Sequence, residues 1–321
     1  MLSICIPAYT YVDYTAEAIS ALLSEPEDFE VIVVEDFDLV DTSAEMHGRI
    51  ALVRELLNSD QRVVWQRNRE TRSIQDNWNY TVSLARRPYV KLMGADDRLC
   101  PGGVAKIQTM LREAPGAQFH GHLARIIDDT GHVIRLQRPY IRSRNFLATR
   151  GAEALQLKLR QIARFKEPAC NVFTKAVWHQ IGGYSTRFRF CFDVDFNIRV
   201  MRENACYLWN EYVVDLRRHA GSDGAKLPAD LAAGELRHLI NEIYGYIGDS
   251  LTPQDKASGE AWFIYRLIEL GLARYRTRPR ECIDFLVRNR GSIEFSPSSM
   301  ARAVRTLARR AWFKDVQCTL P

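Results

Sequence analysis

Residues 29–36 read FEVIVVED, a short apolar run rich in β-branched side chains that ends in two acids. A run of this length and composition is typical of a buried strand. Similar runs occur at residues 2–7, 62–66 and 89–94, and residues 14–24, 44–57 and 74–86 between them have apolar side chains at helical spacing. Strand and helix therefore alternate, which predicts βαβ units and a mainly parallel sheet.

Polar residues stand where these predicted strands end. In parallel sheets, ligands bind beyond the carboxyl ends of the strands. We therefore expect three pairs of neighbours to lie on one rim of the sheet: Tyr9 with Thr10, Glu35 with Asp36, and Asp96 with Asp97.

The pattern changes after residue 103. We expect a helix over 104–113, a hairpin over 117–137 around a turn at 128–132, a helix over 151–164, a strand and helix within 168–184, a helix over 192–204 and a strand within 205–221. From about residue 229 to the end, the apolar spacing is helical. This part carries no motif with a readable function.

Composition narrows the class of protein. The chain has 321 residues, of which 46% are hydrophobic, and no apolar run is long enough to cross a bilayer. The first residues lack the basic region of a secretory signal. Seven cysteines without a CxxC pair indicate reduced thiols and a cytoplasmic location.

The net charge of +5 is unevenly distributed, because residues 271–310 hold ten arginines against Glu281, Asp284 and Glu294. A mildly acidic body with a basic tail argues against a nucleic-acid-binding protein. The tail fits contact with phosphates, with anionic lipid at the inner face of a membrane or with an acidic partner. A solvated basic surface explains it equally well.

Two adjacent carboxylates, Asp96 and Asp97, repel each other unless a cation lies between them. Mg²⁺ and Mn²⁺ prefer carboxylate oxygen, and Mg²⁺ uses one or two protein carboxylates together with substrate phosphates. The pair is therefore compatible with a nucleotide-diphosphate site. Taken alone, a solvated turn that caps a helix is an equally simple explanation.

Other nucleotide and hydrolase sites lack their signatures in this sequence. No GxGxxG follows the first strand, and there is no GxxxxGK[ST], GxSxG or HExxH. A dinucleotide site of the Rossmann type, a P-loop, a nucleophile elbow and a zinc protease are therefore excluded.

Four stretches in order resemble a family: SICIPAYT, FEVIVVEDFD, DNWNYTVSLARRPYVKLMGADD and GGYSTRFRFCFDVDFNIRV. They are similar to family 2 glycosyltransferases with the GT-A fold, over residues 1–220. The resemblance implies an α/β fold with a mainly parallel, doubly wound sheet and a C-terminal helical extension. It also implies a metal-dependent, inverting hexosyltransferase that moves a sugar from a nucleotide diphosphate to an acceptor hydroxyl, as in polysaccharide biosynthesis.

The resemblance assigns roles at the donor side. Pro7 and Tyr9 match the positions that contact the nucleobase, and Asp36 matches the acid that bonds the base edge. Asp96 and Asp97 match the family's DxD-type element, Asp96 for the ribose and Asp97 for Mn²⁺ or Mg²⁺. Asn77, in the NWN stretch, supports the nucleotide side or packs in the core.

In the second half of the chain, Asp193 matches the aspartate that deprotonates the acceptor hydroxyl, and Asp195 matches a second family acid. A helix N-cap is the structural alternative for Asp193, and one aspartate can serve both roles. In the basic loop after the last strand, Arg218 would bind the diphosphate and His219 would complete the metal shell.

The sequence also departs from the family's pattern. Thr10 stands where asparagine is common, Glu35 where aspartate is usual, Phe37 in place of glycine, and Phe192 in place of an acid. UDP is the expected donor nucleotide, ahead of dTDP or GDP, but these departures weaken the case for uridine and point to an uncommon donor or acceptor.

The expected organisation is a nucleotide-sugar half over residues 1–98, an acceptor and base half over 99–224, and a helical extension over 225–321. The acceptor is a glycan, a lipid-linked molecule or a small molecule, bound by variable loops such as 138–168. The extension could form a homodimer or contact a membrane peripherally through residues 299–314.

Two alternatives stay open. A catalytically silent module that binds a nucleotide sugar or glycan would not need Asp36, Asp97 and Asp193 together. A sugar-1-phosphate nucleotidyltransferase would carry a glycine-rich first loop with an arginine, and IPAYTYVDY has neither.

Overall fold

The computed structural model describes residues 1–37, 43–137, 146–160, 168–219, 228–275, 278–293 and 296–305. The chain forms two compact units. Unit 1 comprises residues 1–148, 167–186 and 204–217, and unit 2 comprises 149–166, 187–203 and 218–321. Residues 138–145 and 161–167 of the predicted acceptor loop, 220–224 of the basic loop and 306–314 of the predicted membrane-contacting segment lie outside the described residues. The three-part division of the chain stays a prediction.

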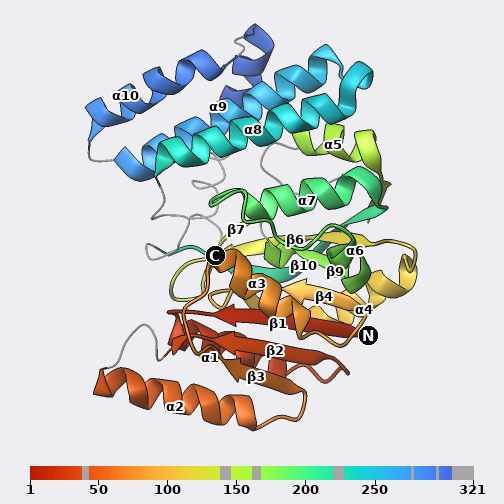
Figure 1. Cartoon of the computed structure of the whole chain (residues 1–321), viewed down its shortest axis with the longest axis vertical. Helices are drawn as coiled ribbons and strands as arrows, with labels where there is room; N and C mark the ends of the chain where they lie inside the picture. The colour runs from red at the N-terminus through yellow and green to blue at the C-terminus, as the bar shows by residue number, and fades with distance from the viewer. Residues whose placement is uncertain are drawn as a thin grey trace, which may run out of the picture. The chain divides into compact units, whose positions relative to one another are not determined.

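The parallel half of the sheet is as predicted. Strand β1 (Leu2–Ala8) lies between β2 (Glu30–Glu35) and β4 (Tyr89–Leu92), and β3 (Val63–Arg67) flanks β2 (Figure 1). All three pairings are parallel. The carboxyl ends of these four strands therefore lie on one rim.

The second half of the sheet mixes directions. Strand β9 (Asn171–Thr174) is antiparallel to both β4 and β6 (Phe119–Ile127), whereas β10 (Cys206–Arg217) is parallel to β6. The predicted hairpin is confirmed, because β7 (Val133–Leu136) pairs antiparallel with β6. Strands β5 (Arg98–Leu99) and β8 (Phe146–Thr149) both pair with β10.

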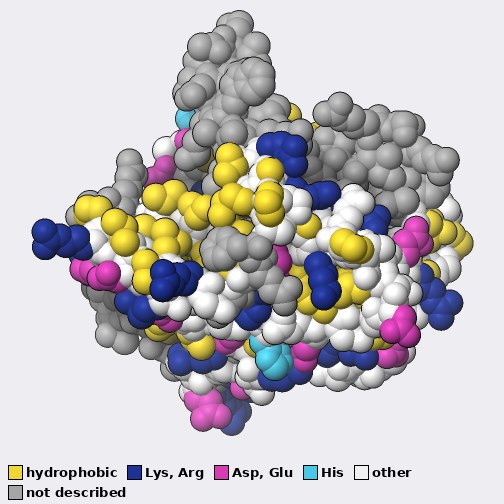
Figure 2. Space-filling view, turned by 90° about the horizontal axis from the view of Figure 1, so that it is seen from above, with side chains coloured by type: hydrophobic (Ala, Val, Ile, Leu, Met, Phe, Trp, Pro, Cys, Tyr) yellow, Lys and Arg dark blue, Asp and Glu magenta, His cyan; other side chains and the backbone are white. Residues whose placement is uncertain are grey.

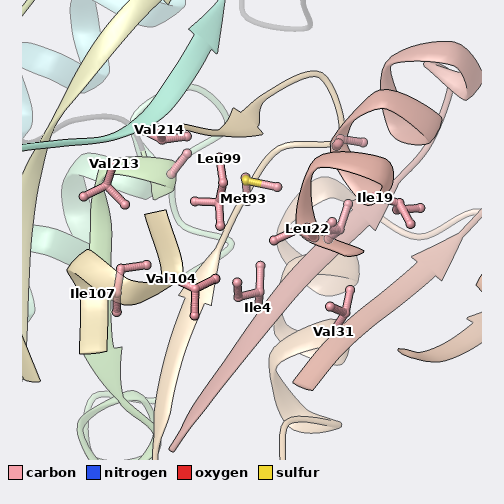
Figure 3. Close-up of a cluster of buried hydrophobic side chains, with 14 of the residues drawn as sticks. Ile4, Ile19, Leu22, Val31, Met93, Leu99, Val104, Ile107, Val213 and Val214 are labelled. Carbon is pink, nitrogen blue, oxygen red and sulfur yellow. The ribbon is translucent and has the colours of Figure 1, made fainter. Parts of the chain in front are cut away.

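Helices cover both faces of the parallel strands. Helices α1 (Val12–Leu23), α2 (Ala44–Asn58) and α4 (Gly103–Glu113) share one core with the inward side chains of β1 and β2. Figure 3 shows Ile4, Val31 and Met93 in this core, together with Ile19 of α1 and Val104 of α4. On the other face, the Cys5 thiol reaches the carbonyl of Thr81 in α3 (Ile74–Ser83) at 3.7 Å.

Short helical elements complete unit 1, and helices dominate unit 2. In unit 1 these are η2 (Pro168–Cys170) and α6 (Lys175–Gln180). Unit 2 contains α5 (Gly151–Arg160), α7 (Phe192–Glu203), α8 (Ala229–Ile247), η4 (Gly248–Ser250), α9 (Pro253–Tyr275), α10 (Pro279–Asn289), η5 (Arg290–Ser292) and a helix over 297–305. The helical spacing predicted from residue 229 onward is confirmed over the described positions.

Two further expectations concern thiols and the membrane. The six cysteines within the described ranges are free, and all but Cys282 are buried. Among the described residues, no helix combines the length and apolar character that a bilayer crossing requires.

A buried charge network stabilises the strand pairings next to the rim. The Asp215 carboxylate on β10 is fully buried and accepts hydrogen bonds from Nε of Arg125 at 2.6 Å and Nε of Arg98 at 2.9 Å. Burial alone would raise the pKa of Asp215, but the bonds from Arg125 and Arg98 outweigh it and hold the pKa below its usual 3.8. The network therefore joins β5, β6 and β10 by charge.

Replacing this carboxylate tests its contribution to stability. Asp215→Asn should lower the free energy of unfolding by about 2 to 4 kcal/mol at neutral pH, because two arginines lose a buried counter-charge while keeping part of their side chains in water. Because the folded pKa of Asp215 is depressed, its stabilisation is present above the unfolded pKa and is lost as the pH falls through the folded value. Urea unfolding at neutral and acidic pH measures both effects.

The matched control is Asp28→Asn, which removes an exposed ion pair with Arg87. Its cost should stay below about 1 kcal/mol. Equal losses in the two variants would show that the Asp215 network is no more stabilising than a surface pair.

Candidate functional site

The structure brings the predicted donor-side residues to one rim of unit 1. The register pairs Ala8 of β1 with Glu35 of β2, and the backbone N–H of Asp36 donates to the Ala8 carbonyl at 3.0 Å. Strand β4 ends at Leu92, and Asp96 and Asp97 follow it in a turn. Parallel pairing is therefore the reason that residues from three strand ends share one edge.

At the end of β1, Pro7 is buried and Tyr9 is 39% exposed. Pro7 fixes the backbone that leads into the rim, and the Tyr9 ring keeps much of its surface in solvent. A flat, half-exposed aromatic ring at this edge is suited to stacking against a planar ring of a ligand.

Asp36 belongs to a polar cluster that the sequence revealed only in part. The Asp36 carboxyl is 1% exposed, and the side-chain amide of Asn68 donates to it. The same amide donates to the Asn77 side-chain oxygen at 2.9 Å, and Nε of Arg72 donates to the Asn68 oxygen at 3.1 Å. Burial raises the pKa of Asp36, while Asn68 opposes the shift.

The sequence motifs did not single out Asn68, although its position carries a signal. It directly follows β3, so the rule that polar residues at parallel strand ends share a rim applies to it as well. Asn77 was found, and it lies in this cluster at the start of α3, where Ser73 caps the helix. Three elements therefore orient the Asp36 carboxyl.

Glu35 takes no part in this cluster. Its side chain is fully buried and accepts two hydrogen bonds from Arg54 of α2, at 3.0 Å and 2.6 Å, and one from the Phe37 backbone at 2.9 Å. The carboxylate therefore ties β2 to α2. Of the two acids that end the second strand, Asp36 alone joins the polar cluster with Asn68.

Arg217 holds the turn that carries Asp96 and Asp97. Its backbone N–H donates to Asp97 Oδ1 at 3.0 Å, and its Nε donates to the Asp96 carbonyl at 2.9 Å. The guanidinium is itself buried, paired with Glu17 of α1 at 2.5 Å and bonded to the carbonyls of Asp128 and Asp129. Arg217 directly precedes Arg218 and His219, the two residues singled out in the basic loop.

Gly94 leaves room for the two carboxylates. A Cβ atom at this position would lie 2.6 Å from Asp96 Oδ1 and 3.2 Å from Asp97 Oδ2. A distance below 3.0 Å requires one of the groups to move, so any side chain at residue 94 would displace the Asp96 carboxylate. A side chain at residue 94 would therefore change where the Asp96 carboxylate lies.

A buried amine lies near these acids. Lys91 of β4 is fully buried, and its Nζ donates to the Ala169 carbonyl and contacts Nε2 of His122 at 2.9 Å. Burial lowers the pKa of Lys91 to about 8, and Cys170 and the Asp97 carboxylate oppose that shift. The amine therefore adds positive charge near Asp97 from inside the protein.

The donor set at this turn fits a hard divalent cation. Asp96 and Asp97 are only partly buried, and their oxygens are the ligand type that Mg²⁺ and Mn²⁺ prefer. No cluster of three or more His, Cys, Asp or Glu side chains arranged to hold a metal occurs in the described part of the chain. An ion that takes most of its ligands from substrate phosphates and water needs no such cluster.

The remaining predicted residues belong to unit 2. Asp193 is the second residue of α7 and is half-buried, and its Oδ1 accepts the Val194 backbone N–H at 2.7 Å. Asp195 is buried and paired with Arg187 and Arg199, each at 2.8 Å, which indicates a structural role. Arg218 is exposed and His219 is half-buried, both directly after β10.

Comparison with known proteins decides the family. The sequence profile of "Glycosyl transferase family 2" matches residues 3–182, which is more than half of the chain. The chain belongs to this family. It is therefore a glycosyltransferase, and the resemblance found in the sequence motifs is confirmed.

Solved structures confirm the GT-A fold of this glycosyltransferase. The S. aureus TarS 1-349 in complex with UDP-GlcNAc superposes with a TM-score of 0.60 at 12% identity, over 95% of this chain and 88% of that one. The mannosyltransferase PcManGT from Pyrobaculum calidifontis, in complex with GDP-Man and Mn²⁺, gives a TM-score of 0.51 at 13% identity, over 99% and 84% of the two chains. At these identities the likeness concerns the fold.

A sequence relative comes from Mycobacterium tuberculosis strain CDC 1551 / Oshkosh. Its uncharacterized protein MT1568 is 27% identical over 275 residues, which cover 82% of this chain and 81% of that protein. The similarity thus extends past the residues matched by the family profile and into the helical part of the chain.

The Asp36 cluster makes a prediction that needs no ligand. Asn68→Ala should raise the pKa of Asp36 further, because the amide donor that favours the ionised carboxylate is removed while the burial remains. Carboxyl carbon chemical shifts followed against pH measure that pKa. Asn58→Ala, which removes an exposed amide on α2, is the control and should leave Asp36 unchanged. An unchanged Asp36 pKa in Asn68→Ala would contradict the proposed electrostatic role of Asn68.

Proposed function

We propose that this glycosyltransferase moves a sugar from a nucleoside diphosphate donor to a hydroxyl of a glycan, lipid-linked or small-molecule acceptor, with a divalent metal ion and with inversion at the anomeric carbon. The observation that carries the proposal is the rim of unit 1. There the Asp36 cluster ends one strand, and the Asp96–Asp97 turn, held by Arg217, follows a parallel strand of the same sheet.

The donor side is proposed to bind the nucleotide base through Pro7, Tyr9 and Asp36. A buried carboxylate held by the Asn68 amide, which also donates to Asn77, is suited to accept an N–H from a base edge, and the Tyr9 ring is suited to stack on the face of the base. UDP is the favoured nucleotide, ahead of dTDP or GDP. TarS with UDP-GlcNAc and PcManGT with GDP-Man support a nucleotide sugar in this fold.

The metal is proposed to bind Asp97, with Asp96 at the ribose and Arg218 and His219 contributing to the diphosphate and the metal shell. Bound there, Mn²⁺ or Mg²⁺ would neutralise charge on the leaving diphosphate. Arg217 fixes the Asp97 carboxylate through its backbone N–H, and Gly94 leaves the space that both carboxylates need. The Mn²⁺ complex of PcManGT supports a metal in this fold.

Asp193 is proposed as the general base. Its carboxylate accepts the proton of the acceptor hydroxyl while that oxygen forms a bond to the anomeric carbon. The bond from this carbon to the diphosphate oxygen breaks on the opposite face, and its electron pair leaves with the nucleotide. A base of this kind contributes about 10²- to 10⁴-fold to the rate.

A donor panel tests the proposal. UDP-glucose, UDP-N-acetylglucosamine, dTDP-glucose and GDP-mannose are each mixed with the protein in Mn²⁺ and in EDTA, and the release of nucleoside diphosphate is measured. One donor should be turned over in Mn²⁺ and not in EDTA. Asp97→Asn should lose Mn²⁺-dependent nucleotide binding, whereas Asp193→Asn should keep that binding and lose about 10²- to 10⁴-fold in rate.

Asp249→Asn, an exposed acid in η4, is the charge-matched control and should behave as the unaltered protein. Binding without turnover of any donor would favour the silent module. Turnover of a sugar-1-phosphate with a nucleoside triphosphate would favour the nucleotidyltransferase. Equal loss of binding in Asp97→Asn and Asp193→Asn would move Asp193 to the donor site.

The basic helices of unit 2 are proposed to contact an anionic membrane at its inner face. Along α10 and the residue after it, Arg280, Ile283, Val287 and Arg290 follow one another at spacings of three and four, which places them on one stripe of the helix. Ile283 is 59% exposed and Val287 49%. Figure 2 shows hydrophobic side chains beside Lys and Arg side chains on one face of the molecule.

The arginines in this α10 stripe of Arg280, Ile283, Val287 and Arg290 favour anionic lipid as its partner. An apolar stripe flanked by arginines buries its hydrophobic side chains at the acyl boundary while the cations meet anionic headgroups. Helix α10 also carries the exposed acids Glu281 and Asp284, so charge alone does not oppose a homodimer, and the experiment below distinguishes the two occupants.

Vesicle flotation measures this contact. The protein should float with phosphatidylcholine vesicles that contain phosphatidylglycerol, remain behind with phosphatidylcholine alone, and dissociate at high salt because screening weakens the headgroup attraction. Ile283→Ser should reduce flotation, whereas Leu52→Ser, an equally apolar and exposed side chain on α2, should not. A dimer that Ile283→Ser dissociates, without any flotation, would assign the stripe to a second copy of the chain.

A further inference from the structure

One carboxylate of α8 accepts three consecutive backbone N–H groups. Oε1 of Glu235 accepts the N–H of Arg189 at 2.8 Å, and Oε2 accepts those of Phe190 at 2.8 Å and Cys191 at 2.9 Å. All four residues belong to unit 2. Three successive backbone N–H groups therefore point at one carboxylate. Such a run of N–H groups forms a concave site for an anion.

The three N–H groups belong to the segment that delivers Asp193. Residues 189–191 lie in no helix or strand, and α7 begins at the next residue. The Cys191 carbonyl accepts the N–H of Asp195 at 2.8 Å, which is the first hydrogen bond of the helix. Because Asp193 stands one residue inside this start, the position of its carboxylate follows from how the segment 189–191 is held.

A second contact joins the same helix to the same segment. Arg187 donates to the Asp195 carboxylate at 2.8 Å and to both oxygens of Glu242 on α8, at 2.7 Å and 2.9 Å. The ring of His238 lies 5.7 Å from the Phe188 ring, centroid to centroid. Residues 187–191 are therefore held to α8 along their length, and Arg187 links Asp195 of α7 to Glu242 of α8.

The three α8 residues in these contacts share one face of the helix. Glu235, His238 and Glu242 are separated by three and four residues, so their side chains project in nearly the same direction. The apolar positions Leu236, Leu239, Ile240 and Ile243 are buried. Helix α8 is anchored by one face in the unit 2 core and holds the 187–191 segment with the other.

We infer that helix α8 positions the catalytic base, and that Glu235 of α8 is the positioning residue for Asp193. The inference rests on the proposed role of Asp193 as general base. Glu235 does not touch the substrate; it fixes the start of α7, so that the Asp193 carboxylate stays aligned with the acceptor hydroxyl. This positioning role gives the helical extension a part in the reaction, although its sequence carries no readable motif.

The test uses Glu235→Gln in the full chain. A glutamine offers one acceptor oxygen in place of two and turns an NH₂ group toward the remaining backbone N–H, so at least one of the three bonds is lost. Misplacement of a reacting group by about 1 Å can cost on the order of 10²-fold in rate. Turnover of the donor that the panel identifies should therefore fall about 10- to 100-fold, while binding of its nucleoside diphosphate with Mn²⁺ stays unchanged.

Glu203→Gln is the matched control, because it neutralises an exposed carboxylate at the other end of α7. It should change neither rate nor binding. Hydrogen exchange by mass spectrometry gives a readout that does not depend on activity. Amides of residues 189–191 should be protected in the unaltered protein although they lie outside regular structure, and should exchange faster in Glu235→Gln but not in Glu203→Gln.

A double variant separates positioning from a general loss of structure. If Glu235 acts through Asp193, Asp193→Asn with Glu235→Gln should be no slower than Asp193→Asn alone. Multiplied losses would overturn the inference, as would a wild-type rate in Glu235→Gln or a loss of nucleotide binding equal to the loss of rate. If Glu235→Gln does not fold, Glu235→Asp, which keeps the charge but shortens the side chain, is measured in the same way.

The failure of this inference is distinct from the failure of the proposed function. An Asp193→Asn variant with full turnover would remove the base assignment and the inference with it. If Asp193→Asn is slow and Glu235→Gln is unaffected, the base role of Asp193 stands and only the positioning role of Glu235 is removed.

Discussion

The parallel pairing of β1 with both β2 and β4 is the constraint on which the proposed donor side depends. Because the three strands run in one direction, their carboxyl ends bring Tyr9, Asp36 and the turn at Asp96 to a single edge. An antiparallel neighbour on either side of β1 would have sent one of these groups to the opposite edge. Strand direction thus decides which residues meet at this rim, and residue type decides what they can bind.

Much of the fold could be predicted from the sequence, because its signals are local. Apolar runs such as 29–36 and helical spacing after residue 229 depend on neighbours in the chain, and polar residues at strand ends locate Asp36 and the Asp96–Asp97 pair. What was not predicted depends on tertiary pairing. Glu35 bonds Arg54, which is 19 positions away, and the Arg217 backbone bonds Asp97, which is 120 positions away. No local periodicity in the sequence encodes such pairings.

Buried charge recurs throughout the frame of this enzyme. Asp215 lies between two arginines, Glu35 is bonded to Arg54, and Arg217 extends from Glu17 to the Asp96 carbonyl. Burying charge is costly unless each group is paired, and each of these groups has its partner. Geometry held this way resists small displacements, which suits a site where two neighbouring carboxylates must keep their separation against mutual repulsion.

Gly94 bears on how such a site could be redesigned. The space that separates the two acids is kept open by a hydrogen atom where every other residue would place carbon 2.6 Å from Asp96 Oδ1. A library that varies side chains around this turn should therefore treat position 94 as coupled to Asp96. In such an experiment the most restrictive residue is the one with no side chain, and its importance would not emerge from alanine scanning aimed at functional groups.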